Sequence, residues 1–150
     1  MRIPYGISNF EKLVTEGYHF VDKTPYIEQI ENSDEPYIFF LRPRRFGKSL
    51  FVSMLHHYYG LEYKEKADAL FGRYHIGRHP TPGANTFHVL SLEFSGIDTT
   101  TPENTFNGFL DNVRTGAELF IDRYPHVSGD KKKEILSKPA PNMMLRALFA

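Results

Sequence analysis

Apolar residues along the chain follow two patterns, short extended runs and longer stretches with helical spacing. Residues 37–41 (YIFFL) form an unbroken apolar run, and residues 87–94 (FHVLSLEF) form a second run of strand-forming residues. A short run that is apolar on both faces is typical of a central parallel strand that is covered on both sides. The pattern therefore predicts a buried strand at residues 37–41 and another strand at residues 87–94.

Helical spacing predicts most of the remaining elements. The clearest helix follows a glycine turn, carries apolar residues from Leu50 to Tyr59 and ends at Gly60. Another long helix follows Thr101 and Pro102, which have the form of an N-cap and a first-turn proline. Shorter helices are expected at residues 8–15 (opened by a Ser8/Glu11 capping box), 24–32, 63–71, 131–136 and 141–150.

The segment between the first predicted strand and the clearest helix is a basic turn, residues 42–50 (RPRRFGKSL). It ends as the phosphate-binding pattern G-x-x-x-x-G-K-[ST] ends, although Arg42 stands at the position of the first glycine. In this pattern Gly47 lets the backbone approach phosphates, Lys48 reaches the outer phosphates and Ser49 can ligate Mg²⁺. The basic turn therefore predicts a nucleotide-phosphate site.

The other residues of the basic turn leave two interpretations open. Arginine side chains pair bidentately with phosphates, but they pair equally well with a neighbouring carboxylate. The alternative is a solvated basic loop that contacts no ligand. We expect a bound nucleotide to contact the basic turn along its length: Arg42, Pro43, Arg44, Arg45, Phe46, Gly47, Lys48, Ser49 and Leu50.

Composition limits the classes of function that the chain can have. Its 150 residues carry 18 Lys and Arg against 18 Asp and Glu, so no global basic field attracts it to nucleic acid or an anionic membrane. The absence of cysteine excludes disulfides, thiolate metal sites and cysteine nucleophiles. No signal-peptide pattern is present and the apolar runs are far too short to span a membrane, so we expect a cytoplasmic protein.

The sequence LRPRRFGKSL closely resembles the signature of the AAA-ATPase-like family, predicted ATPases often fused to a C-terminal nuclease-like domain of the PD-(D/E)XK type. The opening IPYGISNFEKLVTEGYHFVDKTPYIEQI and the LEFSG segment are similar to the family as well. The likeness extends from Ile3 to about Ile97 and is looser beyond. It implies ATP and Mg²⁺ as ligands, and it makes Arg42 a feature of the family.

This resemblance also implies a fold and a domain organisation. We expect an α/β protein, a P-loop NTPase-like three-layer α/β/α fold with a mostly parallel sheet. Residues 1–35 would form a helical N-terminal segment, and residues 36–150 part of the P-loop core. The family's Walker B strand would lie beyond residue 150. The chain also ends within an apolar helical pattern, so we expect an incomplete domain without its catalytic acids or the nuclease-like domain.

Two further groups of polar residues are candidates for the site. Glu93 ends the second predicted strand, where it could serve a metal-linked role or pair with an arginine of the basic turn. In the Asp22-Lys23-Thr24 segment, Asp22 or Lys23 could face the phosphates or the base of a nucleotide. The alternative is that Asp22 and Thr24 cap the following helix.

These observations favour ATP binding through a variant Walker A turn, with hydrolysis expected only in a full-length protein. A second hypothesis is a nucleic-acid or partner-binding module that uses the arginines of the basic turn and Lys48. A third is a truncated fragment that has no function by itself.

Overall fold

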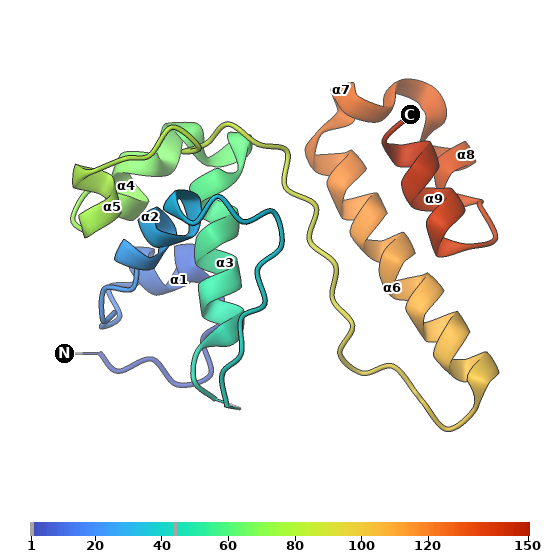
Figure 1. Ribbon diagram of the computed structural model, residues 1–150, viewed down its shortest axis with the longest axis horizontal. Coiled ribbons are helices and arrows are strands. Elements are labelled where there is room, and N and C mark those ends of the chain that lie inside the picture. The colour runs from blue at the N-terminus through green and yellow to red at the C-terminus, as the bar shows by residue number, and fades with distance from the viewer. Residues whose placement is uncertain (1, 44) are drawn as a thin grey trace. The chain divides into compact units, whose positions relative to one another are not determined.

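The structure is a computed structural model, and it describes residues 2–43 and 45–150. The chain divides into two compact units (Figure 1). Unit 1 ends at Val89, and unit 2 comprises Leu90–Ala150. Each unit has its own cluster of buried apolar side chains.

Unit 1 is built from short helices around one longer helix, α3, which is drawn in green in Figure 1. The helices of unit 1 are α1 (Phe10–Thr15), α2 (Pro25–Asn32), α3 (Lys48–Tyr59), η1 (Leu61–Lys66), α4 (Ala67–Phe71) and α5 (His75–Arg78). Gly60, which we expected to end the α3 helix, is its C-cap. The helix predicted at residues 63–71 is present as η1 and α4.

The core of unit 1 is rich in aromatic rings. Phe10 stacks on Phe71 with ring centroids 5.0 Å apart, and Phe20 meets Phe10 edge to face at 5.4 Å. Met54, on α3, is fully buried in the same cluster. Ser53 joins α1 to α3 because its hydroxyl accepts a hydrogen bond from the Phe10 backbone N–H at 2.9 Å. Burial of each such side chain contributes about 1.5–3 kcal/mol, so this cluster holds α3 in place.

Unit 2 consists of a long helix with smaller helices packed on it. The elements are α6 (Pro102–Arg123), α7 (Pro125–Ser128), η2 (Gly129–Lys131), α8 (Lys132–Leu136) and α9 (Pro141–Leu148). Val113, Phe120 and Met144 are buried between α6, α8 and α9. Thr101 caps α6 by accepting a hydrogen bond from the Asn104 N–H at 3.0 Å, as predicted.

The predicted three-layer α/β/α fold is wrong. Among residues 2–43 and 45–150 the chain forms no sheet, and its β pairing is limited to isolated bridges, Arg2 with Tyr18 and Gly60 with Phe87. The predicted central strand, residues 37–41, is an exposed extended segment in which Tyr37 is 91% and Phe39 87% accessible. An extended apolar segment becomes a central strand only where neighbouring strands pair with it, and no described segment does so.

The second predicted strand is also an extended segment without a ladder. Its first residue, Phe87, exchanges backbone hydrogen bonds with Tyr59 and Leu61 at the end of α3, each at 3.0 Å. Farther along, Leu92 and the carbonyl of Ser91 pack closely against Gly116 of α6. The segment is held at these points by helices instead of by other strands.

The capping box predicted for the first helix is wrong, because the helix is capped one residue later than expected. Asn9, not Ser8, is the N-cap of α1, and its side chain accepts a hydrogen bond from the Lys12 N–H at 2.8 Å. Glu11 pairs with Lys66 at 2.7 Å instead of reaching back to the cap. No helix within the described residues is long and apolar enough to cross a membrane.

Candidate functional site

The basic turn enters α3 through a left-handed glycine. Gly47 is the N-cap of α3 with φ +76° and ψ 22°, a conformation that glycine adopts without steric cost. Its carbonyl accepts the first helical hydrogen bond, from the Phe51 N–H at 2.9 Å. Arg45 also has a positive φ, +68°, so the backbone curls tightly just before the helix begins.

The start of α3 leaves backbone donors available. No side chain within the described residues caps this helix, because its N-cap is glycine. The first N–H groups of a helix have no partner inside the helix, and the helix dipole places partial positive charge there. The arrangement suits an anion, since N–H groups and the dipole act together.

Lys48 is exposed, and its side chain lies across the basic turn. Its ammonium donates a hydrogen bond to the backbone carbonyl of Arg42 at 3.0 Å. The guanidinium of Arg42 lies over the ring of Phe40, 5.7 Å from the centroid. The structure thus brings Arg42 and Lys48 together and places Arg42 against an aromatic ring.

The remaining predicted residues of the basic turn are mostly exposed. The Phe46 N–H donates to the carbonyl of Pro43 at 3.4 Å, and the Phe46 ring is 66% accessible. Ser49, at the second position of α3, is exposed, and Leu50 is half-buried. Arg44 lies outside the described residues, so its predicted role stays a prediction.

Two concave regions flank the basic turn. We call the first the polar hollow; it has a volume of about 640 Å³. It is lined on one side by Arg45, Lys48 and Ser49 and on the other by residues 4–8 of the N-terminal segment. We call the second the apolar cavity; it has a volume of about 310 Å³. Pro4, Gly47 and Leu50 border both regions.

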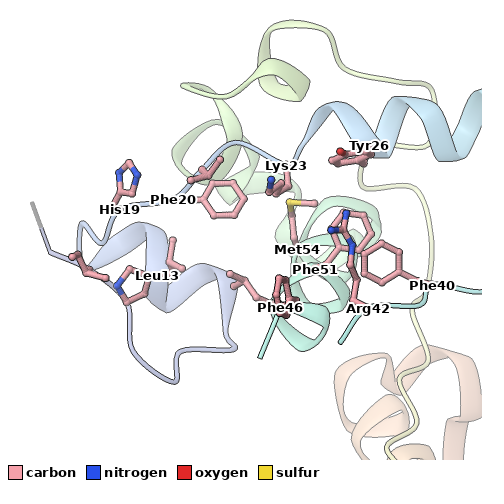
Figure 2. Close-up of a pocket in the computed structure, with 15 residues that line it drawn as sticks. Leu13, His19, Phe20, Lys23, Tyr26, Phe40, Arg42, Phe46, Phe51 and Met54 are labelled. Atoms are coloured by element: carbon pink, nitrogen blue, oxygen red, sulfur yellow. The ribbon is translucent and has the colours of Figure 1, made fainter. Parts of the chain in front are cut away.

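The apolar cavity is lined by residues from several separate segments and is partly open to solvent (Figure 2). The aromatic rings that line it belong to His19, Phe20, Tyr26, Phe40, Phe46 and Phe51. Sequence reasoning did not find this cavity, because no motif or periodicity links residues so far apart in the chain. A partial signal was present in Lys23, which was considered as a residue facing a nucleotide and which does line the cavity.

Asp22 and Thr24, the neighbours of Lys23, have structural roles. The Asp22 carboxylate accepts hydrogen bonds from the Thr24 N–H at 2.9 Å, the Thr24 hydroxyl at 2.6 Å and the His75 N–H at 2.9 Å. Partial burial opposes ionisation of Asp22, but the hydrogen bonds from Thr24 and His75 outweigh it and lower its pKa. These hydrogen bonds join the start of α2 to the start of α5. The neighbouring residue, Lys23, lines the apolar cavity.

Glu93 lies in unit 2, in the extended segment before α6. Its carboxylate is exposed and accepts a hydrogen bond from the Ser95 hydroxyl at 2.7 Å. The described residues contain no group of three or more His, Asp or Glu arranged to hold a metal ion. A metal-linked role for Glu93 therefore stays a prediction.

Comparison with known proteins gives a family match over most of the chain. A family described as Predicted AAA-ATPase matches residues 4–147. An uncharacterized protein in the vnfD 5' region of Azotobacter chroococcum mcd 1 is 46% identical over 56 residues. Those residues cover 36% of this chain and 10% of that much longer protein. No solved structure matches the chain.

Proposed function

Because the chain belongs to the predicted AAA-ATPase family, we propose that it binds ATP through the basic turn. The observation that carries this proposal is the arrangement at the start of α3. Gly47 curls the backbone in a left-handed conformation, and Lys48 lies across the turn. Glycine, lysine and a free helix N-terminus are the parts that hold nucleotide phosphates in variants of the Walker A pattern.

Phosphate oxygens would occupy the polar hollow. The backbone N–H groups at the start of α3 would donate to them, and Lys48 would exchange its hydrogen bond with the Arg42 carbonyl for one with a phosphate. That exchange is favourable because an ionised acceptor binds an ammonium more strongly than a neutral carbonyl does. Arg45 lines the same hollow and would add a second cation.

The residues present fit Mg²⁺ only as an ion that arrives with the nucleotide. The Ser49 hydroxyl lines the polar hollow and can supply one oxygen ligand. Mg²⁺ commonly takes its other ligands from phosphates and water. The bound ion would neutralise phosphate charge.

For this chain we propose ATP binding and not ATP hydrolysis. Among the described residues neither the polar hollow nor the apolar cavity is lined by Asp or Glu. Hydrolysis needs a group that positions the attacking water and acids that hold the ion. We therefore propose ATP hydrolysis only for a longer protein that supplies those acids.

Titration calorimetry with Mg-ATP tests the proposal on the Lys48→Ala variant. Loss of a charge-assisted contact should weaken ATP binding about tenfold or more. Lys64→Ala is the matched control, since Lys64 is a lysine of unit 1 that borders neither concave region. Equal ATP affinity in wild type and Lys48→Ala would end the proposal.

A second candidate function is binding of single-stranded nucleic acid. The observation that favours it is the exposure of Phe46 beside the basic residues Arg45 and Lys48. Exposed rings among cations can stack bases and neutralise the backbone. A short oligonucleotide whose affinity falls steeply with salt, and which ATP does not displace, would support this function over the first.

A further inference from the structure

We propose that unit 1 has a second anion site, which binds the phosphate group of a small phosphomonoester. The site is a pocket of about 350 Å³, which we call the arginine pocket. It is lined by Arg2, by residues 17–20 after α1, and by Arg73 and Tyr74 between α4 and α5. Among the described residues that line it, none belongs to the basic turn or to α3, so this inference does not rest on ATP binding at that turn.

The two arginines of the pocket are each held on a tyrosine ring. The guanidinium of Arg2 lies over the ring of Tyr18, 5.0 Å from its centroid. The guanidinium of Arg73 lies over the ring of Tyr74 at 4.9 Å. Tyr74 is buried and meets Phe20 edge to face at 5.2 Å, so its ring is a fixed platform. Because stacking restricts both arginine side chains, a ligand that binds them loses less conformational entropy.

The backbone brings Arg2 to the pocket from the N-terminal segment. The Arg2 carbonyl accepts a hydrogen bond from the His19 N–H at 2.7 Å, and Arg2 forms an isolated parallel bridge with Tyr18. The Arg2 guanidinium donates one hydrogen bond, to the carbonyl of Glu16 at 3.1 Å. Its other N–H groups remain for a ligand, since an arginine side chain carries several donors in a planar fork.

The positive charge at the pocket is not balanced by a carboxylate of the protein. Within residues 2–43 and 45–150, neither Arg2 nor Arg73 forms an ion pair. No Asp or Glu is among the described residues that line the pocket, and the Glu16 carboxylate pairs with Lys12 at 4.0 Å. Two guanidiniums at one pocket repel each other, and a bound anion would relieve that repulsion.

The charge and shape of the donors suit a phosphate dianion. Guanidinium groups pair bidentately with phosphate oxygens, and the two arginines balance the two charges of a phosphomonoester. The His19 ring also lines the pocket and can donate one further hydrogen bond. A carboxylate ligand carries a single charge and would leave one arginine unbalanced.

The rest of the lining suits a small apolar group attached to the phosphate. Tyr18, Phe20 and Tyr74 provide aromatic surface beside the arginines. The volume of about 350 Å³ lies at the lower end of the range for small-molecule sites, about 300–1,000 Å³. The pocket therefore matches a compact phosphomonoester better than it matches free phosphate, which would leave the aromatic surface in water.

Nuclear magnetic resonance of the whole chain tests the site, with inorganic phosphate and phenyl phosphate as probes. Both probes should shift the backbone amide signals of Gly17 and His19 saturably, with dissociation constants on the order of 1 mM. Phenyl phosphate should bind severalfold more tightly, because its ring would be buried against the aromatic surface. Potassium chloride at equal ionic strength controls for salt. Equal affinity for the two probes would overturn the phosphomonoester and leave a site for free phosphate.

Arg2→Ala and Arg73→Ala should each weaken the binding of both probes about tenfold, as loss of charge-assisted hydrogen bonds does. Both side chains are exposed, so the variants should fold. Lys64→Ala is the matched control, because Lys64 is an exposed cation of unit 1 that does not line the pocket. Wild-type affinity in both arginine variants, or no saturable shift in the wild type, would overturn the proposal.

Lys48→Ala separates the arginine pocket from the proposed ATP site. This variant should keep the phosphate-dependent shifts of Gly17 and His19 whether or not it binds ATP. If Lys48→Ala abolishes these shifts, they report on the basic turn and the arginine pocket is wrong. The ATP proposal has its own test, titration calorimetry with Mg-ATP, so either proposal can fail while the other stands.

Discussion

The Lys48 ammonium donates a hydrogen bond to the backbone carbonyl of Arg42 across the basic turn. The lysine that would bind phosphate is thus already held over the turn in the free protein. Because the carbonyl is a neutral acceptor, an ionised phosphate would bind the ammonium more strongly and can replace it. Because this hydrogen bond already restricts the Lys48 side chain, ligand binding would lose less conformational entropy.

Nucleotide should protect the basic turn from proteolysis. Arg45 is exposed in the free protein, so trypsin can cleave after it. A ligand that fixes the turn lowers the population of cleavable conformations, and saturating Mg-ATP should slow this cleavage severalfold. The measurement is the rate of appearance of the Arg45 fragment in a timed digest. Cleavage after Lys64 is the internal control, and equal protection of Lys48→Ala would contradict the prediction.

Gly47→Ala should lower both stability and ligand affinity. A non-glycine residue at φ +76° costs about 1 kcal/mol, although a Cβ there would meet no atom within 4 Å. Thermal melts measure the first effect and calorimetry with Mg-ATP the second. Gly17→Ala is a matched control, since Gly17 has φ +71° and equally open surroundings but borders neither concave region. It should lose similar stability and keep its ATP affinity; equal affinity losses in the two variants would refute a local role for Gly47.

Gly116→Ala should destabilise unit 2. A Cβ at this position of α6 would lie 2.5 Å from Leu92 Cδ2 and 2.9 Å from the Ser91 carbonyl oxygen. The backbone oxygen cannot move as a side-chain end can, so we expect a cost of about 1–3 kcal/mol in chemical denaturation. Gly108→Ala meets only the Ile97 side chain, at 2.9 Å, and should cost less. An unchanged midpoint in Gly116→Ala would show that the extended segment does not pack on α6.

Asp22 should make unit 1 sensitive to acid. Its pKa lies below the ordinary value of 3.8, because hydrogen bonds from Thr24 and His75 outweigh the effect of burial. The ionised carboxylate therefore stabilises the fold above about pH 4, and this contribution is lost as the pH falls through the lowered pKa. Asp22→Asn should remove about 1 kcal/mol at pH 7, a value reduced for the exposure of the side chain, and flatten the pH dependence below pH 4.

Thermal melts between pH 2 and pH 7 measure this difference. Glu35→Gln, which changes another exposed carboxylate of unit 1, should leave the profile as it is in the wild type. Parallel profiles for wild type and Asp22→Asn would contradict the prediction.

Local signals in the sequence were sufficient to predict the long helices. Thr101 and Pro102 mark the start of α6, and Gly60 marks the end of α3, because caps and helix-ending glycines act on neighbouring residues. The motif at Gly47-Lys48-Ser49 is also contiguous, so its position at the start of a helix could be predicted. The phosphate binding that we propose for it also rests on residues that are adjacent in sequence.

The strands could not be predicted from the same kind of signal. Residues 37–41 have the composition of a buried strand, but pairing depends on partners elsewhere in the chain. The structure leaves this segment exposed. The apolar cavity could not be predicted for a related reason. Phe20, Tyr26 and Phe40 lie far apart in the sequence and meet there only because separate segments pack together.

The exposed segment 37–41 affects how the protein behaves at high concentration. Its residues form no backbone hydrogen bonds with the rest of the described chain, and Tyr37 and Phe39 are almost fully exposed to water. A flat apolar segment with free backbone donors and acceptors is a template for intermolecular β pairing and fibril growth. We therefore expect the purified protein to self-associate slowly as its concentration rises. The substitution Phe39→Lys should slow this self-association and leave the core of each unit unchanged.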